Sequence, residues 1–342
     1  MDDSADRLLI HVGFHKTGTS YLQRLVFNDT TQGFCSPVDR HRLRDVLVRT
    51  SPFTFDSAGV RAAFLPHLVQ AAHGRLVPVL SHEQLSGQPA GGGYGLRRRE
   101  REASRKEVAE RIHAAFPEAR ILIVIREQKD MVRSIYKWLV CGWEGRLSAS
   151  IEQFLDQSPL ERGHSPLFNF EYLEYHWIIQ HYRRLYGDSA VLTLPYEWLR
   201  KDPVAFVNRI REFVDLPPAD RIPIERINVG RSAASCQVKR WLNRIVVSPN
   251  RPGCVSRAER WAARFSTRLG RYLPGTLHAR AEAGLKRQIS RLLAGVYAES
   301  NANTARMTGI DLRTWGYEMP PDKPVAQSSG HSSASSAVDR DS

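Results

Sequence analysis

Residues 13–20, Gly-Phe-His-Lys-Thr-Gly-Thr-Ser, combine residue types that bind anions. An apolar run from Leu8 to Val12 precedes them and residues 21–26 have helical spacing, so they should form a loop between a strand and a helix. Such a loop directs backbone N–H groups and a helix N-terminus toward an anion. Lys16 adds a positive charge, and three hydroxyl groups add hydrogen-bond donors, those of Thr17, Thr19 and Ser20. The segment therefore predicts an anion-binding loop.

The order of residues in this loop differs from that of the Walker loop of NTP-binding proteins. In the Walker loop the lysine directly follows the second glycine. Here Lys16 precedes Gly18, so the match to that motif fails. The plain alternative is an ordinary strand-to-helix turn with a solvated lysine.

A second segment, residues 120–138, places an arginine at the end of a predicted strand. The apolar, β-branched run that ends at Arg126 is typical of a strand buried on both faces, and residues 130–138 continue at helical spacing. Ligands of open α/β sheets bind at the carboxyl ends of the strands. The guanidinium of Arg126 could hold two phosphate oxygens there, with Ser134 about two turns along the helix. Alternatively, Arg126 only ends the strand and Ser134 is a surface serine.

A third segment carries two side chains that could act as a general base. Residues 76–80 form a short apolar run, although Pro78 weakens the strand or places it at a sheet edge. The run ends at Ser81-His82-Glu83, and either His82 or Glu83 could accept a proton. Neighbours on a strand point to opposite faces, so only one of the two should face a substrate. Alternatively, His82 is a packed histidine and Glu83 a solvated carboxylate.

Together these segments resemble the sulfotransferases that use 3′-phosphoadenosine-5′-phosphosulfate (PAPS), and most closely their bacterial branch. The resemblance implies that the loop binds the 5′-phosphosulfate through His15, Lys16, Thr17, Gly18, Thr19 and Ser20. It implies that Arg126 and Ser134 hold the 3′-phosphate, and that Lys16 stabilises the leaving phosphate. Arg231 is a further candidate for the 3′-phosphate, although residues 227–232 depart from the Arg-Lys-Gly form of the family.

The resemblance also implies the reaction. A sulfuryl group would pass from PAPS to an acceptor hydroxyl of a glycan, a glycolipid or another small metabolite, leaving adenosine 3′,5′-bisphosphate, with no metal required. The Ser-x-Glu pattern favours Glu83 as the base over His82. Two alternatives remain open at this point: a P-loop nucleotide-dependent kinase or NTPase, and a non-catalytic module that binds anions or membranes.

The elements that must position these residues form an alternating pattern of strands and helices. We expect strands at 8–12, 76–80, 120–126 and 190–194, and helices at 21–26, 106–115, 130–138, 171–186 and 204–214. This pattern predicts a single α/β domain over residues 1–318, with a central, mainly parallel sheet flanked by helices, in the P-loop NTPase-like sulfotransferase fold. Residues 88–101, rich in glycine and arginine, would be a lid over the acceptor or a plain insertion, and residues 319–342 a disordered tail.

The C-terminal part of the domain, residues 237–292, carries most of the net charge of +13. Arginines recur at three- and four-residue steps from 257 to 271, while Trp261, Phe265 and Leu269 occupy another face. This predicts a basic amphipathic helix that contacts an anionic membrane surface or an acidic glycan. The alternative is a solvated, charged face over the core.

The remaining composition indicates an intracellular enzyme. The acidic N-terminus is unlike a secretory signal, and no run of 18 uncharged apolar residues occurs, which argues against a membrane span. The four cysteines are widely spaced, as expected for reduced thiols. We expect a cytoplasmic protein, with peripheral contact to the inner membrane face through residues 257–271. No nucleic-acid motif accompanies the arginines, so nucleic acid is not an expected partner.

Overall fold

The computed structural model describes residues 7–89, 103–141, 146–223, 225, 232–247 and 256–321. In these residues five strands form one parallel sheet in the order β2-β3-β1-β4-β5. The strands are β1 (Leu9–Gly13), β2 (Phe34–Cys35), β3 (Val77–His82), β4 (Arg120–Ile125) and β5 (Val191–Pro195). The expected central parallel sheet and its four predicted strands are therefore confirmed.

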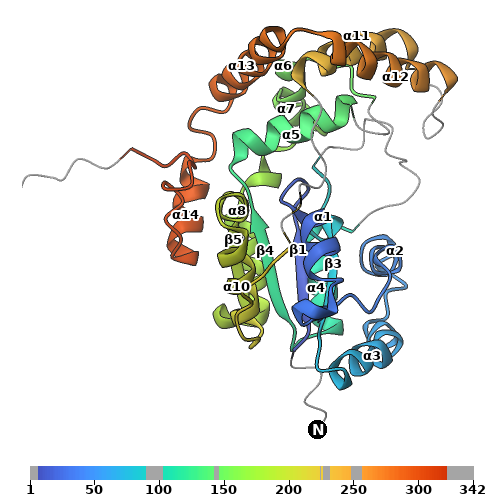
Figure 1. Cartoon of the computed structure of the whole chain (residues 1–342), viewed down its shortest axis with the longest axis vertical. Coiled ribbons are helices and arrows are strands. Elements are labelled where there is room, and N and C mark those ends of the chain that lie inside the picture. Colours follow the sequence, from blue (N-terminus) through green and yellow to red (C-terminus); the bar gives the residue numbers. More distant parts are fainter. Residues whose placement is uncertain are drawn as a thin grey trace, which may run out of the picture.

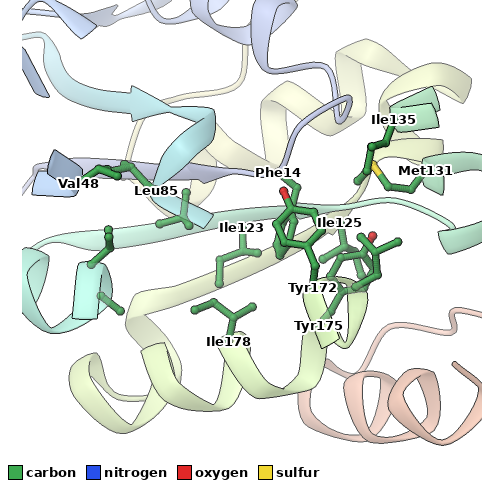
Figure 2. Packing of buried hydrophobic residues seen from close by; sticks show 14 of the residues in the cluster. Phe14, Val48, Leu85, Ile123, Ile125, Met131, Ile135, Tyr172, Tyr175 and Ile178 are labelled. Carbon is green, nitrogen blue, oxygen red and sulfur yellow. The ribbon is translucent and has the colours of Figure 1, made fainter. Parts of the chain in front are cut away.

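Both faces of the sheet are covered by helices, which explains the continuous apolar runs of the strands. Alternate residues of β4 enter two separate cores: Ile121, Ile123 and Ile125 pack in one, and Leu122 and Val124 in the other. Figure 2 shows the first core, in which Ile125 lies beside the rings of Tyr172 and Tyr175.

The helices follow the strands in the alternation that the sequence predicts (Figure 1). After β1 the chain forms α1 (Thr19–Tyr21), which continues as a π-helix, η1 (Leu22–Val26). The other helices around the sheet are α2 (Arg40–Arg44) with η3 (Asp45–Arg49), α3 (Ser57–His73), α4 (Arg105–Ala115), α5 (Gln128–Cys141), α8 (Tyr175–Tyr186), α9 (Tyr196–Lys201), α10 (Pro203–Phe213) and α14 (Ala298–Thr308). Two short helices, α6 (Ile151–Phe154) and α7 (Ser158–Glu161), follow α5.

Three further helices form a layer beyond α5, at the end of the molecule away from the N-terminus (Figure 1). They are α11 (Ala233–Val246), α12 (Arg257–Tyr272) and α13 (Gly275–Leu292). A Cβ at Gly270, near the end of α12, would lie 1.9 Å from the Oγ of Ser235, near the start of α11. The two helices therefore run antiparallel and in close contact.

Two local expectations are corrected by the structure. Pro78 lies in β3, which has a neighbour on each side, so the strand is not an edge strand. The N–H of Val77 donates to Gly33 on the β2 side, so position 78 faces β1, and the proline is tolerated because pairing of β3 with β1 begins only at Val79. The helix expected over 171–186 is divided, because residues Phe170–Leu173 form a 3-10 turn, η5, before α8 begins at Tyr175.

Candidate active site

The loop after β1 carries the predicted anion-binding residues at the carboxyl edge of the sheet. Gly18 has a φ of 82°, and a Cβ there would lie 2.7 Å from Leu199 Cδ2 and 3.1 Å from the ring of Tyr196. Only glycine therefore fits between the loop and α9. Lys16 also has a left-handed backbone, with a φ of 67°. For a lysine this conformation is uncommon, and such strain is found preferentially at functional sites.

Two of the loop hydroxyls are used to build the loop. Thr17 Oγ1 donates to the carbonyl of Phe14 at 2.6 Å, and Thr19 Oγ1 donates to the same oxygen at 3.3 Å. Both threonines are buried, whereas Ser20 is half-buried. Our expectation that the hydroxyls of Thr17 and Thr19 add donors for an anion does not fit this geometry. The donors that the loop offers are the backbone N–H groups of its first helical turn, together with Lys16.

Lys16 and Arg126, which lie 110 residues apart, meet at the ends of β1 and β4. Arg126 Nη1 donates to the carbonyl oxygen of Lys16 at 2.9 Å, and its guanidinium carbon lies 5.0 Å from the centre of the Tyr196 ring. Arg126 Nε is buried and has no hydrogen-bond partner among the described residues. A half-buried guanidinium is suited to an anionic ligand, because it can pair with two oxygen atoms at once. The structure thus brings the two predicted cationic side chains into one site.

The ammonium group of Lys16 lies against α5, 5.1 Å from the centre of the Trp138 ring. Lys16 is exposed as a whole, but partial loss of solvent around its ammonium group lowers its pKa; the carboxylate of Glu83 opposes this shift, and Arg126 adds to it. Ser134 is half-buried one turn before Trp138, so it shares the helix face that meets the loop. Ser134 therefore lies on the same side of the sheet as Lys16.

His82 is the last residue of β3 and caps the turn that follows. Its Nδ1 accepts a hydrogen bond from the backbone N–H of Gln84 at 3.0 Å, at the start of the 3-10 turn η4 (Glu83–Ser86). Burial lowers the pKa of His82 to about 4, so the ring is neutral at pH 7. Because a neutral imidazole has one lone-pair nitrogen, the cap leaves Nε2 as an N–H donor. His82 is therefore poorly placed to accept a proton.

Glu83 begins the turn instead of continuing the strand, so the expected alternation of faces between residues 82 and 83 does not apply. Its side chain is partly exposed, as an acceptor substrate would require. Burial works to raise its pKa, but His82, a backbone hydrogen bond, His15 and Arg40 together lower it below the ordinary 4.5. Glu83 is therefore a carboxylate at neutral pH and can accept a proton.

A buried network that the sequence analysis missed joins the loop to this turn. His15 Nδ1 lies 3.2 Å from Tyr172 Oη, and Tyr172 Oη lies 3.5 Å from Ser86 Oγ. Ser86 in turn donates to the carbonyl oxygens of Gly13, at 3.1 Å, and Glu83, at 3.0 Å. Burial lowers the pKa of His15 to about 4, so this ring positions the loop and carries no charge at pH 7.

Tyr172 reaches this network from the 3-10 turn η5, and Figure 2 shows its ring beside Phe14. The two ring centres are 5.3 Å apart in an edge-to-face arrangement. In the sequence Tyr172 lies within an aromatic run that reads as helical core. No local pattern could have indicated its contact with a residue 157 positions away.

The comparison with protein families agrees with this arrangement. A model described as the sulfotransferase family matches residues 9–220, which extend from β1 to beyond α10 and include the loop, the turn at Glu83 and Arg126. The chain belongs to the sulfotransferase family. No curated protein matches it. It is similar to a solved structure, the sulfotransferase from Alicyclobacillus acidocaldarius, with 21% identity over 65% of this chain and 85% of that chain and a TM-score of 0.45.

In this sulfotransferase a cavity of about 260 Å³ opens at the ends of β4 and β5, beside the proposed anion site. Glu127 and Glu197, which directly follow Arg126 and Tyr196 in the sequence, line it together with Lys129, Asp130, Arg133, Lys286, Ile289, Trp315 and Gly316. Its three acidic side chains balance its three basic ones. An anion is therefore better accommodated at Lys16 and Arg126 than in this cavity.

Glu197 also ties the C-terminal segment to this end of the sheet. Its Oε1 accepts a hydrogen bond from the backbone N–H of Glu127 at 3.1 Å, and its Oε2 accepts one from Tyr317 Oη at 3.1 Å. Trp315 stacks on Trp198 with ring centres 6.4 Å apart. The Tyr-Glu pair at 196–197 therefore supports the fold around the site.

Several expectations concern residues outside those described. Arg231, residues 90–101 of the glycine- and arginine-rich segment and residues 322–342 of the tail belong to this group. Among the described residues, no group of three or more His, Cys, Asp and Glu side chains could hold a metal ion. In that same part of the chain, every helix is too short or too polar to cross a bilayer.

Proposed function

We propose that this sulfotransferase moves a sulfuryl group from PAPS to a hydroxyl group of a glycan, a glycolipid or another small metabolite. The observation that carries the proposal is the pairing of Lys16 with Arg126 at the carboxyl ends of β1 and β4. The turn that bears the ionised Glu83 lies close enough for its charge to act on Lys16. Two cations for a doubly phosphorylated donor thus lie near a carboxylate that can act as a base.

The donor would be held at its two phosphate ends. The backbone N–H groups of residues 17–20 would bind the 5′-phosphosulfate, and Arg126 and Ser134 the 3′-phosphate, with Arg231 as a further candidate. The half-buried guanidinium of Arg126 supports this assignment, because its planar fork can pair with two phosphate oxygens. Lys16 keeps its charge beside the loop and would stabilise the negative charge that develops on the leaving phosphate.

Glu83 would remove the proton of the acceptor hydroxyl. At the same time the hydroxyl oxygen would bond to sulfur, and the bond between sulfur and the bridging phosphate oxygen would break. The cap that occupies Nδ1 of His82 favours Glu83 as the base and leaves His82 to position the turn. The neutral His15, bonded to Tyr172, would keep the loop in register with that turn. No metal ion takes part in the scheme, since the ammonium and backbone dipoles suffice for sulfuryl transfer.

Nucleotide-dependent thermal stabilisation without magnesium tests the donor assignment. Adenosine 3′,5′-bisphosphate at about 100 times its dissociation constant should stabilise the fold by roughly 2.7 kcal/mol. AMP and ADP, which lack the 3′-phosphate, should stabilise it less at the same concentration. Equal shifts with all three nucleotides would contradict PAPS as the donor, and a shift with ADP that requires magnesium would favour a kinase or NTPase.

A further inference from the structure

The α11–α12 pair exposes an unusual number of large apolar side chains. Trp241 and Ile245 of α11 are 60% and 64% exposed, and Trp261, Phe265 and Tyr272 of α12 are 56%, 41% and 83% exposed. We call these five residues the outer face. Single exposed apolar residues are normal, but a cluster of this size marks an interaction site.

The residues of the outer face point away from the helix against which their own helix packs. Cys236 and Asn243 face α5, because Cys236 Sγ contacts the carbonyl of Lys137 and Asn243 Nδ2 donates to that of Val140. At about 100° per residue, Ile245 lies roughly 180° around α11 from Cys236. On α12, Gly270 faces Ser235 of α11, and Trp261 lies nine residues, roughly 180° around the helix, from Gly270, so the exposed aromatic residues point away from α11.

The aromatic part of the outer face is a preformed surface. The rings of Trp261 and Phe265 are stacked with centres 5.1 Å apart and planes at 14°. Beneath them α12 packs on α11 through small residues, including the fully buried Ala262 and Ser266. The sequence predicted a basic amphipathic helix over 257–271; in the structure its aromatic stripe faces outward instead of covering the core.

Positive charge surrounds the outer face. Four arginines of α12 are exposed: Arg257, Arg260, Arg264 and Arg268. The one acidic residue of the helix, Glu259, is 4% exposed, and its carboxylate accepts from the backbone N–H of Ser256 and pairs with Arg146. Its charge is thus neutralised locally, and the exposed surface of α12 is cationic.

We infer that the outer face docks on a lipid bilayer that contains anionic headgroups. Tryptophan, phenylalanine and tyrosine favour the interface between headgroups and acyl chains, and arginines beside them pair with anionic lipid. A symmetric dimer through this face would bring the arginines of two copies together, which disfavours a second copy as the occupant. An acidic glycan or a nucleic acid could pair with the arginines, but neither would bury the apolar side chain of Ile245.

Vesicle co-sedimentation of the full chain tests this inference without any turnover measurement. The protein should bind vesicles of phosphatidylcholine with phosphatidylglycerol, bind pure phosphatidylcholine much less, and lose binding as salt rises. Replacing Trp261→Ala together with Phe265→Ala should weaken binding at least about tenfold. Arg264→Glu with Arg268→Glu should weaken it about fivefold or more per arginine.

Phe53→Ala is the matched control, because Phe53 is an exposed aromatic residue, 94% accessible, shortly before α3 at the opposite end of the molecule (Figure 1). It should leave vesicle binding unchanged. Circular dichroism and thermal unfolding check that each variant keeps its fold, which the exposure of the altered side chains leads us to expect.

Four results would overturn the inference, the first two of them in the vesicle assay. One is failure of the wild-type protein to bind the anionic vesicles, or undiminished binding by the folded aromatic variant. Another is a wild-type dimer in analytical ultracentrifugation that the aromatic variant converts to a monomer. The last is a wild-type protein that binds heparin or single-stranded DNA but not vesicles, and whose arginine variant loses that binding.

Discussion

Arg126 donates a hydrogen bond to the carbonyl oxygen of Lys16, so the guanidinium proposed for the 3′-phosphate also holds the strained backbone of the residue proposed for the leaving phosphate. The two ends of the donor site are therefore mechanically connected through one side chain. A change at Arg126 should affect both nucleotide recognition and turnover.

Arg126→Ala should remove most of the preference for adenosine 3′,5′-bisphosphate over AMP. Losing a charge-assisted hydrogen bond costs about 1.5–3 kcal/mol, or roughly 10- to 100-fold in affinity. Arg126→Lys should recover only part of the preference. An ammonium group lacks the planar fork of a guanidinium, so it cannot contact the Lys16 carbonyl and a phosphate at the same time. Calorimetric titration measures both affinities, and wild-type discrimination in the alanine variant would contradict the assignment.

Lys16→Ala should reduce kcat by about 10²–10³ while the fold remains intact. The pH profile gives a sharper test. Since the pKa of Lys16 is lowered, turnover should decline on the alkaline side below pH 10.5, as the ammonium loses its proton. Lys16→Arg stays charged, so in this variant the alkaline decline should move to higher pH. An unchanged alkaline limb would show that another group causes it.

Glu83→Gln should reduce turnover by about 10²–10⁴ and leave nucleotide affinity unchanged, because the amide keeps the size of the side chain but cannot accept the proton. His82→Asn should cost much less, since an asparagine oxygen can still cap the turn at Gln84. Steady-state kinetics of both variants decide between the two residues. The reverse ranking would assign the catalytic base to His82.

Acid should destabilise the fold through its buried histidines. Burial lowers the pKa of His11 to about 3 and those of His15 and His82 to about 4. The unfolded chain takes up these protons below about pH 6.5, so stability is greatest above that pH and decreases as the pH falls toward 4. The Tm should therefore drop between pH 7 and pH 5. His11→Asn should flatten this decrease, whereas the same change at the exposed His67 should not.

The sequence was most informative where local pattern and tertiary environment agree. The strands β1, β3, β4 and β5 were predictable because strands buried on both faces read as apolar runs. Strand β2 was not, since its two residues, Phe34 and Cys35, have no periodicity and pair only because β3 offers them an edge. The aromatic stripe of α12 had the expected period, but periodicity alone could not show which way it faces.

In the candidate site, the residue types were predictable and their hydrogen bonds were not. Lys16, Arg126 and Glu83 stand at strand ends, and parallel strands bring such ends together. The hydrogen bond of the Thr17 hydroxyl to Phe14 and the cap made by His82 depend on the backbone conformation of single residues, which no sequence pattern shows. The contact of His15 with Tyr172 depends on the 3-10 turn that interrupts a predicted helix.

The hydrogen bond between Tyr317 and Glu197 gives the last described residues of the chain a part in the core enzyme. The family model stops at residue 220, yet Glu197, in the first turn of α9, bonds to a tyrosine almost a hundred positions beyond that limit. A polypeptide shortened to the matched range would leave this half-buried carboxyl with one hydrogen-bond partner fewer, and Trp198 would lose the ring that stacks on it. The smallest stable catalytic unit should thus extend through Tyr317, and cleavage of the chain between α14 and this tyrosine should inactivate the enzyme.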